Sequence, residues 1–367
     1  MYLKSLQLYN FKNYSENNFD FSENINCFIG DNGAGKTNIL DAIYYLSFTK
    51  SYFNLLDNQN IKHGEDFFAI HGKFVRNNHP DEVSCIQRKN MKKQFRINGK
   101  DYERMVEHIG EFPLVLVSPY DRDLINEGSD IRRKYIDSVI SQFDKHYLND
   151  LVIYNKALFQ RNALLRHFSE KHYFDKASIE IYDKQMEAPA GRIYEKRVEF
   201  LNGFIPVFRN YFEFISNRKE IVDIIYLSGL ADNTLGEILT LNSERDLTMK
   251  YTTGGIHKDD LDFLIGDLPV KKFGSQGQQK SFLIALKLAQ FEYTKSTRGF
   301  KPILLLDDIF DKLDYKRVSQ IIEMVGDHNF GQVFITDTQP ERIDMLFSGS
   351  IQDHLIFNVT EGKATLQ

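Results

Sequence analysis

Residues 30–37 read Gly30-Asp31-Asn32-Gly33-Ala34-Gly35-Lys36-Thr37, which fits the pattern G-x-x-x-x-G-K-[ST]. In this pattern backbone N–H groups surround nucleotide phosphates, the lysine reaches the β- and γ-phosphates, and the threonine hydroxyl binds Mg²⁺. The apolar residues 25–29 precede the loop as a strand would, and apolar residues at helical spacing follow it from Ile39 to Leu46. Strand, loop and helix is the required order, so the segment predicts a nucleotide site. The predicted binding residues are Gly30, Asp31, Asn32, Gly33, Ala34, Gly35, Lys36, Thr37 and Asn38.

The overall composition is that of a globular chain, with 367 residues of which 42% are hydrophobic. This length can bury one large core or two ordinary ones. The net charge of −5 does not indicate nucleic acid, so any surface for a polyanion must be a local patch. Cys27 and Cys85 stand in apolar surroundings without the spacing of metal ligands, and we interpret them as small buried hydrophobes in a reducing compartment.

The N-terminal residues 1–14 alternate apolar and polar side chains like a strand and lack the apolar core of a secretory signal. No segment approaches the roughly 18 apolar residues of a membrane-spanning helix. We therefore expect a cytoplasmic protein with no membrane partner.

Three regions of the chain differ in texture. Residues up to about 118 suggest mostly strands, with turn signals at 77–80 and at Asn98-Gly99. Residues 131–216 are rich in helix-forming and aromatic residues at helical spacing, with a break expected at 189–191. After Leu227 the mixed texture returns. We predict an α/β domain in two parts, residues 1–125 and 227–367, with a helical arm inserted at 126–226.

The apolar run 302–306 ends in Asp307, which is typical of a buried parallel strand. A phosphate-binding loop needs an acid at such a strand end to orient the Mg²⁺ shell, and we assign that role to Asp307. Asp308 follows, where it could accept a proton from the attacking water or orient it, although it could also cap the next helix. Asp307 lies about 270 residues beyond the loop, too far for one crossover, so the helical block must be inserted between the two halves of the site.

A third candidate segment, residues 273–280, places a serine between two glycines just before a predicted helix at 281–292. Exposed N–H groups, a hydroxyl and the positive end of a helix dipole together favour an anion. An ordinary helix N-terminus is the alternative. Because an acid-ended strand follows about 30 residues later, we favour a nucleotide role. The residues concerned are Ser275, Gly277 and Gln278.

Together these segments resemble ABC-type ATPases, with a signature at 275–278, a Walker B strand at 304–308 and a D-loop at 311–314. The short helical insertion is similar to that of the RecF family, bacterial recombination mediators in the SMC-like branch of this class. Further matching stretches carry the resemblance over nearly the whole chain. They are residues 10–14, 35–38, 118–121, Arg132-Arg133 with Asp137, 160–165 and 255–260.

The resemblance implies an α/β fold, an ABC-type P-loop ATPase head whose mixed sheet is flanked by helices, with an inserted helical arm. It implies ATP and Mg²⁺ as cofactors and an ATP-dependent homodimer in which the signature of one chain completes the site of the other. Hydrolysis would gate the clamping of gapped DNA or of a junction between single and double strands, without sequence preference. The implied catalytic residues are Lys36, Asp307, Asp308, Ser275, Gly277 and Gln278, and the implied protein partners are RecO and RecR.

Some positions depart from the pattern of the class. No glutamine stands clearly at the Q-loop position, residues 118–121, and Thr336-Asp337-Thr338 stands where ABC transporters carry a switch histidine. We therefore predict slow hydrolysis, with ATP acting mainly as a clamp. Ile256 replaces a proline that is common in the family, so we expect that loop to be less rigid.

Basic residues gather before the Asn98-Gly99 turn, which predicts a hairpin that presents them. Lysine and arginine near DNA phosphates give a salt-dependent affinity without sequence preference, whereas a solvated hairpin face is the alternative. These residues are Arg88, Lys89, Lys92, Lys93, Arg96 and Lys100. A second candidate is Arg132, Arg133 and Lys134, although these and Arg161 could equally brace the arm. Aromatic residues at helical spacing in the arm favour core packing over base stacking, and they are Phe200, Phe204, Phe208, Tyr211 and Phe212.

Three other functions fit parts of the pattern. The ATPase subunit of a transporter would need a Q-loop and a coupling surface for membrane helices. A nuclease of the overcoming-lysogenization type would need a further acidic metal domain, for which we expect no room before Gln367. An ATP-gated scaffold that does not itself touch DNA is favoured only by the acidic net charge.

Overall fold

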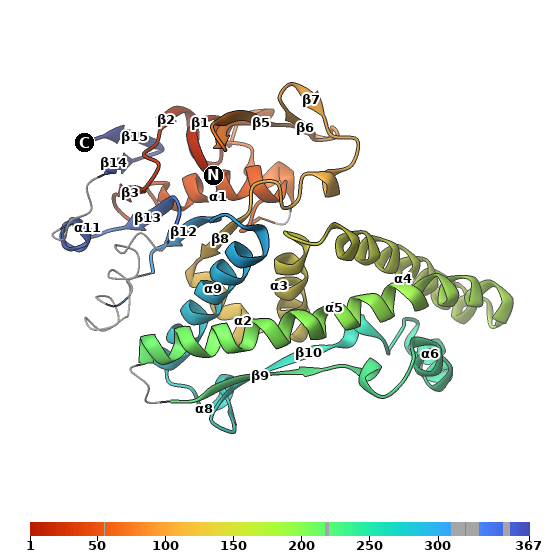
Figure 1. Ribbon diagram of the computed structural model, residues 1–367. Coiled ribbons are helices and arrows are strands. Elements are labelled where there is room, and N and C mark those ends of the chain that lie inside the picture. Colours follow the sequence, from red (N-terminus) through yellow and green to blue (C-terminus); the bar gives the residue numbers. More distant parts are fainter. Residues whose placement is uncertain (55, 217–219, 310–319, 321–329, 348–352) are drawn as a thin grey trace. The chain divides into compact units, whose positions relative to one another are not determined.

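The computed structural model describes residues 1–54, 56–216, 220–309, 320, 330–347 and 353–367 (Figure 1). The chain forms two compact units. The first comprises Met1–Asp121 and Lys280–Gln367 with the short segment Phe214–Asn217, and the second comprises Arg122–Glu213 and Arg218–Gln279.

Within the described residues, the first unit holds two six-stranded sheets. One is antiparallel throughout, in the order β2-β1-β4-β5-β6-β7. Alternating side chains of its strands are buried, as expected for a sheet with one face on the core. The strands are β1 (Tyr2–Phe11), β2 (Tyr14–Asp20), β4 (Phe67–Arg76), β5 (His79–Arg88), β6 (Gln94–Ile97) and β7 (Lys100–Asp101).

The other sheet has the order β15-β14-β3-β13-β12-β8 and is parallel except for its edge strand β15. Its central strands are buried along their whole length, as continuous apolar runs predict. The strands are β3 (Ile25–Ile29), β8 (Leu114–Val117), β12 (Ile303–Asp307), β13 (Val333–Asp337), β14 (His354–Thr360) and β15 (Lys363–Leu366). The predicted strands at 25–29 and 302–307 are thus confirmed.

Helix α1 (Lys36–Phe48) packs against strands of both sheets, so it lies between them in Figure 1. Nearly all its residues are buried, which fits the apolar spacing that predicted this helix. Aromatic rings fill the space beside it, with Phe28 and Phe334 stacked and Phe21 set edge-on to Phe334. Within the described residues of this unit, the other α-helices are most of α9 (Gln276–Arg298) and α11 (Pro340–Phe347).

The second unit is built from long helices and a small antiparallel sheet in the order β11-β10-β9. Helices α3 and α8 pack against β10. The helices are α2 (Asp123–Asn126), α3 (Ser129–Ser141), α4 (Lys145–Lys171), α5 (Lys176–Ser216), α6 (Leu235–Leu241), α7 (Ser243–Met249) and α8 (Val270–Phe273). The strands are β9 (Val222–Leu227), β10 (Asp260–Ile265) and β11 (Leu268–Pro269).

Five short 3-10 helices, from both units, complete the described elements. They are η1 (Asp57–Asn60), η2 (Met105–Glu107), η3 (Pro119–Arg122), η4 (Gly229–Ala231) and η5 (Ile256–Lys258).

Helix α5 corrects the expected break at 189–191. The helix continues through both Pro189 and Pro206. A proline removes one helical hydrogen bond, but burial of the neighbouring Met186, Ala190 and Ile193 holds the helix together across the first of these sites. Further along, the aromatic helix face is buried at Phe200, Phe204, Phe208 and Phe212, as core packing predicts.

The second unit is also larger than the predicted arm at 126–226, because residues 227–279 group with it. Ion pairs hold these segments together, among them Arg132 with Asp260 at 2.6 Å and Arg161 with Asp246 at 2.7 Å. The change in sequence texture after Leu227 therefore marks a change from long helices to the small sheet inside one unit.

Candidate nucleotide site

The loop at residues 30–37 depends on two of its glycines. A Cβ on Gly30 would lie 2.2 Å from the carbonyl oxygen of Val359, closer than atoms can approach. Gly35 precedes helix α1 with a φ of 118°, a conformation that side chains disfavour, and its Cβ would also strike Asn13. The loop can therefore pass close to β14 and turn directly into the helix.

The β1–β2 hairpin supports this loop from one side. The Asn13 amide donates to the carbonyl of Ala34 at 2.9 Å and accepts from the Asn38 amide at 2.7 Å. The Tyr14 hydroxyl donates to the carbonyl of Gly35 at 3.1 Å. The stretch 10–14 matches the family in sequence, and these contacts show that it braces the loop.

Lys36 extends over the loop that precedes it. Its ammonium donates to the carbonyls of Gly30 at 2.6 Å and Asp31 at 2.9 Å. Burial lowers the pKa of Lys36, while the carboxylates of Asp308 and Asp307 oppose that shift. The charge is thus held at the mouth of the loop, where the motif places the β- and γ-phosphates.

The two predicted halves of the site meet at Asp307. One of its carboxylate oxygens accepts from the Thr37 hydroxyl and from the Thr336 hydroxyl, both at 2.8 Å. Burial raises the pKa of Asp307, although these hydrogen bonds oppose the shift. A buried carboxylate beside a threonine hydroxyl is a donor set that suits Mg²⁺, so the residues present fit the predicted metal.

Asp308 and Thr336 complete the wall opposite the loop. The backbone N–H of Asp308 donates to the Thr336 hydroxyl at 3.0 Å, and Asp308 has a φ of 47°, a strained value for a residue with a side chain. Thr336 thus links the two acids, and it occupies the position where ABC transporters carry the switch histidine. A pocket opens here, lined by Asn32, Gly33, Gly35, Lys36, Thr37, Asn38, Asp308 and Thr336. The alternative that Asp308 caps the following helix concerns residues outside those described.

Residues 118–121, at the expected Q-loop position, fold around the carboxylate of Asp121. This buried group accepts from the Tyr52 hydroxyl at 2.6 Å and from the Ser118 N–H at 2.8 Å, and it pairs with Lys287 at 2.7 Å. The segment is therefore fixed by an acid and a lysine.

The signature segment at 275–278 belongs to the second unit and opens helix α9. Ser275 and Gln278 bond each other's backbone reciprocally: the Ser275 N–H donates to the Gln278 side chain at 2.7 Å, and the Gln278 N–H donates to the Ser275 hydroxyl at 3.2 Å. The Gln278 amide also donates to Glu220 at 2.6 Å. This is a helix N-terminal capping box, and it leaves the Ser275 side chain exposed. The predicted D-loop at 311–314 lies outside the described residues.

The predicted DNA hairpin forms, with Asn98 and Gly99 both at positive φ between β6 and β7. Half of its six basic residues are neutralised by acids: Lys89 pairs with Asp66 at 3.1 Å, Lys93 with Asp57 at 2.8 Å and Arg96 with Asp101 at 2.8 Å. Asp57 and Asp66 stand well before the basic run, so no local sequence pattern indicates these pairs. Arg88, Lys92 and Lys100 remain exposed.

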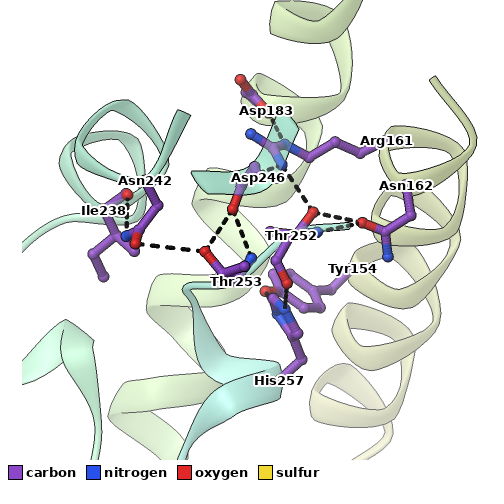
Figure 2. Close-up of polar contacts among 10 residues, drawn as sticks. All are labelled: Tyr154, Arg161, Asn162, Asp183, Ile238, Asn242, Asp246, Thr252, Thr253 and His257. Carbon is purple, nitrogen blue, oxygen red and sulfur yellow. Dashed lines mark hydrogen bonds and ion pairs between the residues drawn. The ribbon is translucent and has the colours of Figure 1, made fainter. Parts of the chain in front are cut away.

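The second basic candidate divides in the structure. Arg132 binds both carboxylate oxygens of Asp260, and Lys134 pairs with Asp130. Arg161 is buried and contacts Asp183, Asp246 and Thr252, as Figure 2 shows. The bracing interpretation therefore fits Arg132 and Arg161, and their partners lie within the same unit.

Comparison with known proteins agrees with this geometry. Residues 2–346 match the family described as the RecF/RecN/SMC N terminal domain. The DNA replication and repair protein RecF of Flavobacterium johnsoniae is 52% identical over 98% of this chain and 100% of its own length. The corresponding protein of Bacteroides thetaiotaomicron is 48% identical over 99% and 98%. The chain belongs to the RecF family.

Solved structures give the same result for the fold. The chain is similar to a structure described as the recombination mediator protein RecF-ATP in the RecFOR pathway, with a TM-score of 0.89, 30% identity and coverage of 100% and 97% of the two chains. It is similar in fold to the Smc head domain of Pyrococcus furiosus, with a TM-score of 0.59, 16% identity and coverage of 100% and 96%. The predicted ABC-type ATPase fold of the SMC-like branch is confirmed. Among the described helices, none is long and apolar enough to cross a membrane.

Proposed function

We propose that this chain is an ATP-dependent DNA-binding protein of replication and recombinational gap repair. The observation that carries the proposal is the meeting of Thr37 and Asp307 at 2.8 Å beside Lys36, from opposite ends of the sequence. The relatives named for DNA replication and repair, and the similar structure described with ATP, support it.

In the proposed reaction a water attacks the γ-phosphorus in line, the bond from that phosphorus to the oxygen bridging it to the β-phosphate breaks, and ADP and phosphate leave. Lys36 neutralises charge on the β- and γ-phosphates, and Asp308 orients the water or accepts its proton. Thr37 and Asp307 would hold Mg²⁺, which would supply positive charge to the phosphates. Thr336 holds the backbone of Asp308 and the carboxylate of Asp307 in register.

We propose that hydrolysis is slow and that ATP acts mainly as a clamp. The hydroxyl of Thr336 replaces the charged or polar ring of a switch histidine, and a hydroxyl gives weaker contact with a γ-phosphate. A turnover below about 10 s⁻¹, the median for enzymes, is expected in a steady-state phosphate-release assay, and a higher value would contradict this part of the proposal.

The proposed active form is a homodimer that encloses two ATP molecules. Each would lie between residues 30–38 of one chain and residues 275–278 of the other. The exposed Ser275 hydroxyl and the N-terminus of α9 offer hydrogen bonds to a γ-phosphate. The proposal includes Mg²⁺ as the metal and gapped DNA or a single/double-strand junction as the DNA that is bound. It also includes RecO and RecR as protein partners and a cytoplasmic location. We also propose that the second unit acts as the arm. The alternative, an ATP-gated scaffold that does not bind DNA, is favoured only by the net charge of −5.

Light scattering after size exclusion tests the clamp directly, with and without ATP, Mg²⁺ and gapped duplex. Wild type is expected to double its mass with ATP and to carry DNA as a dimer. Lys36→Ala should remove ATP binding, and Ser275→Arg should retain ATP binding but remain monomeric. Lys4→Ala, on an exposed strand position, and Ser296→Arg, at the far end of α9, are matched controls that should behave as wild type.

The outcomes separate the claims. A wild-type protein that stays monomeric with ATP and DNA together would overturn the dimer. A dimer that forms with ATP but binds no duplex at low salt would favour the scaffold alternative.

A further inference from the structure

The segment at residues 251–260, between α7 and β10, carries one of the stretches that mark the family, and it belongs to the second unit rather than to the unit that holds the pocket. Its acidic residues face inward to arginines. Asp259 pairs with Arg197 at 2.9 Å, and Asp260 pairs with Arg132 at 2.6 Å. The negative charge of the segment is therefore already neutralised by buried or half-buried partners.

Hydrogen bonds also fix the backbone of this segment. Asp246 on α7 accepts from the N–H and the hydroxyl of Thr253, at 2.8 and 2.6 Å. Thr252 donates twice to the Asn162 side chain and accepts from Arg161, so α4 holds the same loop from the other side (Figure 2).

His257 is the last link in this support. Its ring contacts the Tyr154 hydroxyl at 2.8 Å and the carbonyl of Thr252 at 3.0 Å, and burial lowers its pKa to about 4 (Figure 2). It is therefore a neutral support at physiological pH. These hydrogen bonds support the loop, which has isoleucine at 256 in place of proline.

The outward side of this region carries cations. Lys258 and Arg245 are exposed, and Lys258 lies 4.8 Å from the ring centre of the exposed Tyr251. Arg133 lies next to them, because its guanidinium donates to the carbonyl of Asp259 at 2.5 Å. In the part of the chain that the structure describes, none of these three cations has a carboxylate within ion-pair distance.

These positive charges also crowd one another. Burial lowers the pKa of Lys258, and Arg133 and Arg245 lower it further, with only Asp246 opposing among its acidic neighbours. Burial lowers the pKa of Arg133 as well, and Arg197 adds to this, while Asp260, Asp130 and Asp259 oppose it. A bound anion would relieve this repulsion.

We propose that Arg245, Tyr251 and Lys258, with Arg133 beside them, form a contact for the phosphodiester backbone of DNA on the second unit. We call this surface the arm platform. The proposal rests on the proposed function, since it adds a second DNA contact to that activity. The distribution of charge favours DNA. Among the described residues, three of the six hairpin cations have no acidic partner, the whole chain carries −5, and the arm platform supplies further cations on a support held by hydrogen bonds.

The test measures how the affinity of the ATP-bound protein for gapped duplex depends on salt. Arg245→Ala with Lys258→Ala removes two exposed cations and leaves the buried supports intact. We expect the affinity near 0.1 M salt to fall about tenfold or more. The negative slope of log affinity against log salt should become shallower by about 2. Lys171→Ala with Lys184→Ala removes the same charge from exposed positions on α4 and α5 and should leave the slope unchanged.

Two further measurements keep the result interpretable. ATP affinity and the melting temperature should match wild type in both double variants. Lys258→Arg, which keeps the charge, should retain the wild-type slope, whereas Lys258→Gln should make the negative slope shallower by about 1.

The arm platform and the proposed function fail in different ways. If wild type binds no duplex at any salt, the proposed function fails and the arm platform with it. If wild type binds but Arg245→Ala with Lys258→Ala keeps the affinity and the slope, only the arm platform is wrong. Equal losses in the two double variants would also overturn it, because they would show an effect of net charge alone.

Discussion

The nucleotide loop at 30–38 and the segment at 251–260 are both short polar stretches with glycines at their turns, yet they use their polar groups in opposite ways. At the nucleotide loop, Lys36, Thr37 and Asp308 line one open pocket, and the Thr37 hydroxyl bonds the buried Asp307. In the other segment, the carboxylates of Asp259 and Asp260 are bound to arginines inside the unit.

This difference separates side chains that can bind a ligand from ion pairs that stabilise the fold. The side chains of Lys36, Thr37 and Asp308 face the pocket and are available for a ligand, and the adjacent Asp307 is buried with its pKa raised by that burial. Charges paired inside a unit stabilise one arrangement of its segments, and removing one partner leaves the other buried alone. Mutations should therefore separate activity from stability between the two regions.

The largest effect is expected from Arg197→Met in the second unit. The Arg197 guanidinium is 2.8 Å from Asp137 and 2.9 Å from Asp259, and it is buried. Its loss leaves a buried carboxylate unpaired, which should lower the free energy of unfolding by about 3–5 kcal/mol. Urea unfolding followed by circular dichroism measures this.

Arg192→Met on the same helix is the matched control. Arg192 pairs with Asp150 at 2.6 Å, but 56% of the arginine side chain is exposed, so the loss should stay below about 1 kcal/mol. If both variants lose the same stability, the interpretation of Arg197 as a structural anchor is wrong.

The second-largest effect is a loss of ATP turnover, and it should come with unchanged or increased stability, unlike the loss of stability expected for Arg197→Met. Asp307→Asn should reduce ATP turnover by at least about 100-fold, because the carboxylate charge proposed to hold Mg²⁺ is lost. Since burial raises the pKa of Asp307, its ionised form destabilises the fold at pH 7, and the amide should unfold at the same or a higher temperature.

Turnover and melting temperature, measured on one preparation, check this pair of expectations. Asp308→Asn is the comparison variant: it should slow turnover but keep the dependence of ATP affinity on Mg²⁺. A clear loss of stability in Asp307→Asn would show that this carboxylate serves the fold rather than a ligand.

A smaller effect is expected from pH, through His257. Its pKa is about 4 in the folded protein because of burial, against about 6.5 in an unfolded chain. The unfolded chain therefore binds a proton below pH 6.5 that the folded protein excludes until about pH 4, so stability falls as the pH is lowered. By pH 5 the loss should be about 2 kcal/mol.

His257→Gln removes this titration. The difference in the free energy of unfolding between pH 7.5 and pH 5 should thus be smaller in the variant than in wild type. Equal differences would mean that other groups account for the whole pH dependence.

Much of the nucleotide site could be predicted because its information is local. Residues 25–37 contain a strand, a loop and a helix start in order, and the apolar run before Asp307 identifies a buried strand by itself. Only the pairing of the loop with Asp307 required a longer argument: the two are about 270 residues apart, which implied an inserted block between them. Thr336 was found at the switch position, but its bonds to both acids could not be read from the sequence.

The second unit was harder because its order depends on pairs far apart in sequence. The contact of Arg161 with Asp246 spans 85 residues, and no pattern near either residue announces it. The sequence left open whether Arg132 and Arg161 brace the arm or contact DNA, and only their partners decide. Helix α5 shows the same limit, since proline at 189 predicts a break unless the buried contacts around it are known.

The smallest predicted effect tests the brace between the β1–β2 hairpin and the nucleotide loop. Asn13→Ala removes the hydrogen bond to the carbonyl of Ala34 and the one from Asn38. A neutral hydrogen bond contributes at least about 0.5 kcal/mol, so the loss of both should lower ATP affinity by at least roughly fivefold while turnover at saturating ATP stays unchanged. Asn17→Ala is the control on the same hairpin, because Asn17 bonds Ala364 instead of the loop. If the two variants weaken ATP binding equally, the hairpin stabilises the unit as a whole; if only Asn13→Ala does, the hairpin belongs to the nucleotide site, and the open pocket depends on a neighbouring element for its shape.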